Sequence, residues 1–382
     1  MDDTSIEFLD EFKEIEPYRG EDFISALERL KNSRFLINNL RKAAFRDSLF
    51  IFKPFLNLLV KAFVKYHLRN VKTPYDFQKS IIKAVIGRMI DKTTTALTFS
   101  GLEKLDPNQR YLFISNHRDI VLDPALANFA MTKNNMPTFE IAFGDNLLVN
   151  DLVADLIRIN KSFIVRRNQQ PREQLTSTII LSKYIWYTLH VNDSVWIAQR
   201  EGRAKDGNDL TNPALIKMFF LSQRKGGLQF SEFINQLKII PIAISYEYDP
   251  CDKLKARELD RRETKEGYKK RKGEDFISMV QGIRDFKGRV HLSFGDALNG
   301  NWEDSKDVSA AIDRFIHTNY RLWPSNYLSW DILHGSDRHS SHYDEKYKEA
   351  FIKRFHRLPE NVKKHALSAY AKPVENAEKY RF

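Results

Sequence analysis

The 382-residue sequence contains a single cysteine, Cys251. One thiol cannot form an internal disulfide, and it cannot build a cysteine-based zinc site. Long uncharged apolar runs are also missing, because the most apolar stretch, residues 49–67, is interrupted by Lys53, Pro54 and Lys61, which makes a membrane-spanning helix costly. The acidic N-terminus has no apolar core of the signal-peptide kind. We therefore expect a location in the cytoplasm or, peripherally, on the cytoplasmic face of a membrane.

The composition is that of a globular protein with excess positive charge. Hydrophobic residues make up 42% of the chain and the formal net charge is +11, which favours an anionic partner such as nucleic acid, a phospholipid surface or a phosphorylated metabolite. No helix-turn-helix, zinc-finger or aromatic RNA-binding pattern is present, so we expect no nucleic-acid partner. Two basic segments, residues 253–275 and the tail after Pro359, are typical of solvated helix faces, although each basic residue near anionic lipid would contribute about 1 kcal/mol.

One amphipathic segment, residues 49–67, has two interpretations of about equal weight. It is either an ordinary helix docked on its own protein or a helix lying in the plane of the lipid headgroups. In the second case an apolar stripe enters the bilayer while lysines face the phosphates. The stripe comprises Phe52, Phe55, Leu56, Leu59 and Phe63, and the lysines are Lys53, Lys61 and Lys65.

The hydrophobic pattern predicts an α/β fold with a mostly parallel central sheet flanked by helices, after a helical N-terminal region. Short β-branched or aromatic runs alternate with longer segments of helical period from Tyr111 onward. The expected strands are residues 111–115, 138–143, 162–166, 194–199, 238–246 and 289–294, and the clearest helices between them are residues 171–190 and 212–224. We divide the chain into a helical N-terminal region (1–100), a central α/β domain (101–325) and a basic helical C-terminal extension (326–382).

The stretch ISNHRDIVLDP, residues 114–124, carries the most reactive set of side chains. His117-Arg118-Asp119 is similar to the catalytic loop of a protein kinase, but that loop needs an asparagine five residues after the aspartate, where Pro124 stands. The nearest equivalent of the kinase D-F-G is RDFKGR, residues 284–289, far downstream and with a lysine in place of the glycine. The kinase interpretation is therefore rejected.

Acyl transfer needs fewer catalytic groups than the kinase reaction, and the sequence has a candidate residue for each of them. A base must take the proton of the attacking hydroxyl, and histidine, with a reference pKa near 6.5, is the usual choice. His117 is that candidate. A carboxylate on its other ring nitrogen would fix the tautomer and stabilise the imidazolium, and either Asp123 or Asp119 could supply it.

The same stretch resembles the first signature block of the glycerolipid acyltransferases, N-H-x-x-x-x-D, with five residues instead of four between His117 and Asp123. Three further stretches follow in the family's order. Residues 159–167, INKSFIVRR, are similar to the second block; residues 198–207, AQREGRAKDG, to the third, with one residue fewer between glycine and arginine; and residues 239–247, IIPIAISYE, to the fourth. The resemblance implies a fold like that of glycerol-3-phosphate acyltransferase.

It also implies which residues hold the acceptor. Forked guanidinium groups at two strand ends would grip a phosphate. Matching the blocks residue by residue gives the substrate-binding set Arg166, Arg167, Arg200, Glu201, Gly202 and Arg203, beside the catalytic pair His117 and Asp123.

The implied activity is transfer of a fatty acyl group from acyl-CoA or acyl carrier protein to a hydroxyl of 1-acyl-glycerol-3-phosphate or glycerol-3-phosphate, in phospholipid biosynthesis at a membrane surface. No cofactor or metal is expected, and His334, His339 and His342 beside Asp337 have no familiar ligand spacing. The alternative is a catalytically inactive acyltransferase fold that acts as a basic membrane- or nucleic-acid-binding protein.

Overall fold

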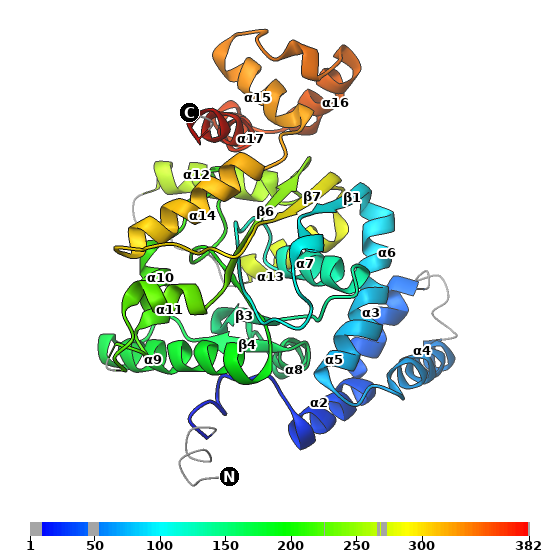
Figure 1. The fold of residues 1–382 in the computed structure, drawn as a ribbon. Helices are drawn as coiled ribbons and strands as arrows, with labels where there is room; N and C mark the ends of the chain where they lie inside the picture. Colours follow the sequence, from blue (N-terminus) through cyan, green and yellow to red (C-terminus); the bar gives the residue numbers. More distant parts are fainter. Residues whose placement is uncertain (1–9, 45–52, 225, 266–267, 269–272, 381–382) are drawn as a thin grey trace. The chain divides into compact units, whose positions relative to one another are not determined.

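The computed structural model describes residues 10–44, 53–224, 226–265, 268 and 273–380. They form two compact units, and the chain passes between them more than once. The first unit comprises Met1–Val85 and Thr138–Tyr184, and the second comprises Ile86–Pro137 and Ile185–Phe382. Each unit has its own helices and strands (Figure 1).

The first unit places a helical N-terminal region beside a two-stranded parallel ladder. Strands β3 and β4 pair in parallel with Ile141 opposite Ser162, and helix α8 connects them. The elements are α2 (Gly20–Asn32), α3 (Arg34–Ala44), α4 (Lys53–Leu68), α5 (Pro74–Asp76), the π-helical turn η2 (Phe77–Ile82), β3 (Glu140–Gly144), η4 (Asp145–Leu147), α8 (Asp151–Ile159), β4 (Ser162–Val165) and α9 (Pro171–Tyr187), which continues into the second unit.

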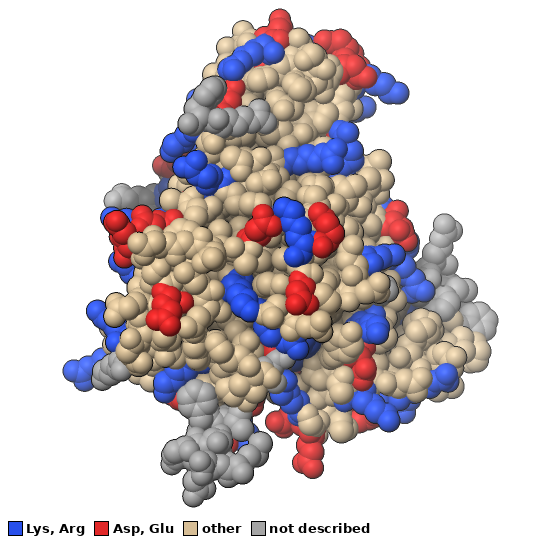
Figure 2. All heavy atoms as spheres, in the orientation of Figure 1, with Lys and Arg blue, Asp and Glu red and all other residues tan. Residues whose placement is uncertain are grey.

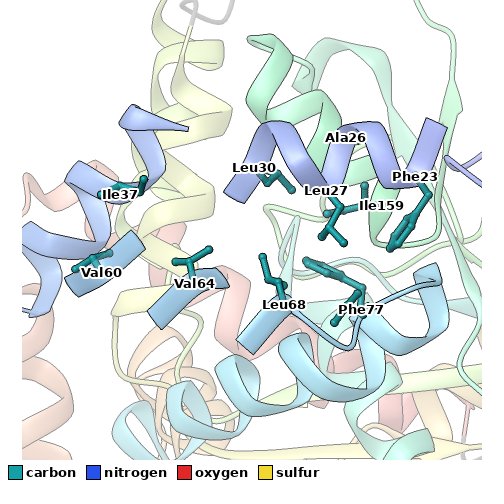
Figure 3. Packing of buried hydrophobic residues seen from close by; sticks show 11 residues of the cluster. Phe23, Ala26, Leu27, Leu30, Ile37, Val60, Val64, Leu68, Phe77 and Ile159 are labelled. Carbon is teal, nitrogen blue, oxygen red and sulfur yellow. The ribbon is translucent and has the colours of Figure 1, made fainter. Parts of the chain in front are cut away.

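Helix α4 corresponds to the amphipathic segment, and one of its faces is docked on the protein. Val60, Val64 and Leu68 recur every fourth residue and pack in a core cluster with α2 and α8; Figure 3 shows Leu68 and Phe77 pointing toward Leu27 of α2. Within the expected lipid-facing stripe, Leu56 is buried in the protein, whereas Phe55, Leu59 and Phe63 are exposed; Phe52 lies outside the described residues. The docked-helix interpretation is thus confirmed for one face, while an apolar face stays open to solvent.

The second unit contains five strands in the order β1-β7-β6-β2-β5. Four of the five strand pairs that are described in the two units are parallel, and only β6 and β7 are antiparallel. This confirms the mostly parallel α/β class. The elements are α6 (Lys83–Thr93, which begins in the first unit), β1 (Thr94–Ser100), η3 (Leu102–Lys104), β2 (Leu112–Ser115), α7 (Leu122–Lys133), η5 (Thr188–Asn192), β5 (Val195–Ala198), α10 (Pro213–Phe220), α11 (Phe230–Gln236), β6 (Ile239–Tyr246), α12 (Asp252–Thr264), α13 (Glu274–Arg284), β7 (Gly288–Phe294), α14 (Ser305–Asn319), α15 (Pro324–His334), η6 (Ser340–His342), α16 (Glu345–Phe355) and α17 (Glu360–Tyr380).

Strand β2 lies inside this sheet, between β6 on one side and β5 on the other. Its residues are all buried, which explains the unbroken apolar run in the sequence. Ser115 at its carboxyl end pairs with Ala198 of β5 and Ile242 of β6. The loops that follow β2 and β5 therefore leave the same edge of the sheet, where ligands of parallel α/β sheets usually bind.

The C-terminal helices α15, α16 and α17 share a cluster of buried apolar side chains with Ala256 of α12. Polar contacts support this packing, because Tyr370 and Arg354 both donate to Asp252 at the start of α12, at 2.9 and 2.5 Å. The C-terminal helices are therefore fixed to the helix that follows β6.

Two further observations concern the distribution of charged side chains on the surface and the length of the apolar helices. On the face shown in Figure 2, basic and acidic side chains are interspersed, so the positive excess does not gather there. Among the described residues, no helix combines the length and the apolar character needed to cross a bilayer.

Candidate functional site

The loop after β2 is fixed to the sheet by the side chain of Asn116. Its Nδ2 donates to the carbonyl of Ile244 at 3.0 Å, and its Oδ1 accepts from the amide of the same residue at 2.7 Å. The buried side-chain amide of Asn116 thus continues the hydrogen bonding between β2 and β6 for one more residue. The next residue, His117, therefore starts from a backbone position that the sheet determines.

His117 and Asp123 form the expected pair. His117 Nδ1 lies 2.9 Å from Asp123 Oδ2. Asp123 is in the first turn of α7, where the helix dipole favours a negative charge. The loop closes onto the same carboxylate oxygen, which also accepts from the amides of Arg118 and Asp119 at 2.7 and 2.9 Å. The extra residue of the motif is thus absorbed in a tight turn, and the carboxylate reaches the imidazole.

Because a carboxylate only accepts, this contact assigns the proton of the neutral His117 ring to Nδ1. Nε2 is then the nitrogen that a substrate hydroxyl can use. The ring is largely but not completely buried, with 13% of the side chain exposed, and Trp196 of β5 stands edge-on to it at a ring-centre distance of 6.1 Å. This geometry suits a general base, because part of the ring stays open to solvent.

Tyr246, the last residue of β6, was not among the residues selected from the sequence. Its hydroxyl donates to Asp123 Oδ1 at 2.8 Å. Burial and the negative charge of Asp123 raise the pKa of Tyr246 well above its ordinary value, so the hydroxyl keeps its proton and remains a donor. Tyr246 lies within the fourth signature block, but only the pairing of β2 with β6 brings it to Asp123.

Asp119, the other candidate orienter, has a different position. Its Oδ1 accepts from the amides of Val121 and Leu122 at 3.0 and 2.9 Å and so caps α7. Burial, together with the charge of Asp123, raises the pKa of Asp119. Asp123 therefore makes the contact with His117, and Asp119 stabilises the turn that brings Asp123 to the histidine.

Arg118, the conspicuous cation of the motif, is buried in an ion pair. Its Nε and Nη2 lie 3.0 and 2.6 Å from Asp209 Oδ2, and Asn116 Nδ2 donates to the same oxygen at 3.1 Å. The pair holds the loop after β5 against the loop after β2. Gly207 of that loop requires the absence of a side chain, since a Cβ there would lie 2.2 Å from the carbonyl oxygen of Ala369 in α17.

The residues of the third signature block lie next to the histidine loop. The amide of Ala204 donates to the carbonyl of His117 at 2.8 Å, which fixes Arg203 one residue away. Arg203 is 7% exposed and reaches Asp275 at 3.8 Å, while its Nη1 is buried with no hydrogen-bond partner among the described residues. A buried guanidinium nitrogen without an acceptor is costly, and an anionic ligand would satisfy it.

The other substrate-binding candidates are more exposed or lie in the first unit. Arg200 is half-buried, Glu201 is exposed, and Gly202 has a φ of +71°, in the left-handed region that favours glycine. Arg166 and Arg167 follow β4 directly; Arg166 pairs with Glu14, and the Arg167 amide donates to Asp145 at 3.2 Å.

Two potential nucleophiles near the site have other roles. Cys251 is buried, and burial raises the pKa of its thiol to about 12, so it is not a thiolate at neutral pH. The Ser115 hydroxyl is buried and donates to the carbonyl of Asn116 at 2.8 Å. Neither side chain is arranged as an acyl acceptor.

The C-terminal histidines contact aromatic rings. His334 stacks on Trp330 and His342 on Tyr327, at ring-centre distances of 4.0 and 3.8 Å. In the part of the chain that the structure describes, no three His, Cys, Asp or Glu side chains come together as metal ligands would.

Comparison with known proteins finds a family model that is similar to the middle of the chain. Residues 96–245 match the family model described as Acyltransferase. The crystal structure of the 1-acyl-sn-glycerophosphate (LPA) acyltransferase PlsC from Thermotoga maritima is similar at a TM-score of 0.37 and 12% sequence identity, over 67% of this chain and 84% of that one. No curated protein matches the chain. The segment matched by the family model includes His117, Asp123 and all six substrate-binding candidates, and it ends one residue before Tyr246.

Proposed function

We propose that the protein transfers a fatty acyl group from an acyl-CoA or acyl carrier protein thioester to a phosphorylated glycerol acceptor, and the match of residues 96–245 to the Acyltransferase family model supports this proposal. The acceptor is 1-acyl-glycerol-3-phosphate or glycerol-3-phosphate, which places the reaction in phospholipid biosynthesis. The observation that carries the proposal is the 2.9 Å contact between His117 Nδ1 and Asp123, which leaves Nε2 to act as a base.

In the proposed reaction His117 Nε2 takes the proton of the acceptor hydroxyl as its oxygen attacks the thioester carbonyl. Asp123 stabilises the imidazolium that forms. When the tetrahedral intermediate collapses, the carbon–sulfur bond breaks and the imidazolium returns the proton to the departing sulfur. The products are an ester and a free thiol, and no covalent acyl-enzyme is required.

We assign the acceptor phosphate to Arg203 first among the arginines. Its buried Nη1 supports this choice, because a guanidinium held in place before binding loses little freedom when it takes a phosphate oxygen. Arg200, Glu201 and Gly202 lie on the same loop and are proposed to bind beside it.

We further propose that the protein works peripherally on the cytoplasmic face of a membrane, through the open face of α4. Five large side chains on that face, Phe55, Leu58, Leu59, Phe63 and Tyr66, are 45–64% exposed. Residues 53–75 contain five lysines and arginines and no acidic residue. Apolar side chains beside unopposed positive charge favour an anionic lipid surface.

Thiol release from acyl-CoA and from acyl carrier protein thioesters tests the reaction. It should depend on one of the two acceptors, and His117→Ala should lower the rate by roughly 10²–10⁴-fold, the usual contribution of a general base. His334→Ala, which changes an exposed histidine far along the chain, is the matched control and should leave the rate unchanged.

If no acceptor supports thiol release, or if His117→Ala reacts as fast as the wild type, the enzyme hypothesis is lost and the inactive acyltransferase fold replaces it. Arg203→Ala tests the phosphate assignment separately. It should raise the KM for the acceptor and leave the KM for the thioester unchanged; an effect confined to the thioester would contradict the assignment.

A further inference from the structure

Lys255 of α12 is a buried lysine that contacts the turn of His117 and Asp123. Its side chain is 4% exposed, and its Nζ donates to the carbonyl of Arg118 at 2.6 Å. The same ammonium group forms an ion pair with Asp249, as a buried cation requires. The turn after β2 is therefore held from the side of α12 by a charge-assisted hydrogen bond.

The carbonyl that Lys255 contacts belongs to the peptide group between Arg118 and Asp119. The N–H of that peptide group donates to Asp123 Oδ2 at 2.9 Å, and the same oxygen lies 2.9 Å from His117 Nδ1. A cation at the oxygen of a peptide group polarises it and makes its N–H a stronger donor. Lys255 is thus connected to the carboxylate that contacts the imidazole through one peptide group.

Asp249 keeps the Lys255 ammonium group in place. Although burial disfavours a charge at this position, Lys255 holds the pKa of Asp249 below its ordinary value, so the carboxylate is ionised at neutral pH. Its Oδ1 also accepts from the amide of Cys251 at 2.8 Å. A cavity of about 20 Å³ beside the pair has room for one water molecule but not for a phosphorylated glycerol. Lys255 therefore acts on the reaction through the groups that it positions.

The C-terminal helices reach the same ion pair. The Asp249 amide donates to the Tyr370 hydroxyl of α17 at 2.8 Å, and Arg354 Nη2 of α16 donates to the Asp249 carbonyl at 3.2 Å. Both helices lie beyond residue 245, where the match to the Acyltransferase family model ends. The matched segment thus contains His117 and Asp123, whereas a part of the chain outside it holds the lysine that supports their turn.

We propose that Lys255 is a positioning residue for the proposed acyl transfer, which holds the turn so that Asp123 keeps His117 aligned. The C-terminal helices α16 and α17 keep Lys255 in place through its ion pair with Asp249. The inference deepens the proposed function, on which it rests, because it adds to the site a residue that binds neither the acceptor nor the thioester. It also gives the C-terminal helices a part in the reaction.

Steady-state thiol release by the full-length Lys255→Met variant tests the proposal. Methionine has a similar length but no charge, so kcat should fall roughly tenfold, within the contribution of a hydrogen bond to a charged group. Both KM values should stay within about twofold of the wild type. Lys287→Met is the matched control, because Lys287 is also buried but donates to the Asp285 carbonyl at 2.6 Å. Its kcat should stay within about twofold of the wild type.

A proton NMR measurement requires no turnover and so separates this inference from the proposed function. The Nδ1 proton of His117, held against Asp123, should give a far-downfield resonance that His117→Ala abolishes. In Lys255→Met the resonance should broaden, because a loosened turn lets the proton exchange with water, whereas in Lys287→Met it should stay sharp. If the wild type turns over no acceptor, the proposed function fails and the resonance still decides whether Lys255 positions the turn.

Tyr370→Phe tests the link to the C-terminal helices. It removes one hydroxyl group and should lower kcat about threefold, the usual effect of one lost hydrogen bond, and broaden the same resonance. In the double variant with Lys255→Met the two effects should not multiply, because residues of one hydrogen-bonded network are coupled. Effects that multiply would separate the C-terminal helices from Lys255 and contradict that part of the inference.

Three results would overturn the role of Lys255. They are an unchanged kcat and a sharp resonance in Lys255→Met, equal losses in Lys287→Met, and an effect confined to KM. A wild type without the downfield resonance would contradict the alignment on which the role depends. If Lys255→Met does not fold, Tyr370→Phe decides alone, and a wild-type rate with a sharp resonance in that variant would overturn the inference.

Discussion

The turn that carries His117 faces β6 on one side and α13 on the other. Two aspartates four residues apart make different contacts on these two sides. Toward β6, Asp123 accepts from the His117 ring, from two backbone amides and from the Tyr246 hydroxyl. Toward α13, Asp119 accepts from two amides of the helix start and lies against Gly282. The same residue type therefore contacts the imidazole on one side and supports helix packing on the other, and the difference comes from which element each side faces.

The largest expected effect comes from a substitution on the side of the turn that faces β6. Asp123→Asn keeps the shape but replaces one acceptor oxygen by a donor, which no longer holds the His117 tautomer. We expect kcat to fall by roughly 10³–10⁴-fold. Asp119→Asn, the paired control, keeps its capping oxygen and should cost less than tenfold. Steady-state thiol release measures both.

The opposite order of these two effects would exchange the roles of the aspartates. Equal and small effects would mean that the carboxylate does not orient the base at all, despite its 2.9 Å contact with His117.

Tyr246→Phe should have the next largest effect, because it removes one donor from a buried carboxylate. A hydrogen bond to a charged group contributes about 1.5–3 kcal/mol, so the rate should fall roughly 10–100-fold. Steady-state thiol release measures this effect. A rate equal to that of the wild type would reduce Tyr246 to a packing role.

The sequence was sufficient for the six strands from residue 111 onward, because each is a short apolar run between turn residues. It did not reveal β1, TTALTFS, whose side chains are mostly exposed and whose pattern is correspondingly weak. The motif located His117 and Asp123, but the ion pair of Arg118 with Asp209 joins residues 91 positions apart. Tyr246 lies 123 positions from its partner Asp123. Such contacts depend on strand order, which no local pattern contains.

On the side that faces α13, Gly282→Ala should lower the free energy of unfolding by about 1–3 kcal/mol, the usual cost of overpacking. The added methyl would lie 2.3 Å from an Asp119 oxygen, and two amides prevent that carboxylate from moving away. Gly87→Ala in α6 is the control, because its methyl would meet only Phe129 at 3.7 Å and alanine favours a helix. Equal unfolding free energies in denaturant titrations would show that α13 is not packed tightly on the turn.

The smallest expected effect concerns Lys287, the buried lysine that follows α13. Burial lowers its pKa from 10.5 to about 8, although its Nζ donates to Thr93 at 2.9 Å and to the Asp285 carbonyl at 2.6 Å. Above pH 8 the unfolded chain holds this proton more firmly than the folded one. The free energy of unfolding should therefore rise with pH, by about 1 kcal/mol between pH 8 and pH 9 from this group.

Lys287→Met removes that proton from both states. Its unfolding free energy, measured by denaturant titration at pH 8 and pH 9, should rise by about 1 kcal/mol less than that of the wild type across the interval. The comparison uses the change with pH, so it is independent of the hydrogen bonds that the variant loses. An equal change of the unfolding free energy with pH in the two proteins would mean that Lys287 stays charged in the folded state. The side of the turn that faces α13 would then hold a buried cation close to Asp119, in place of a neutral amine.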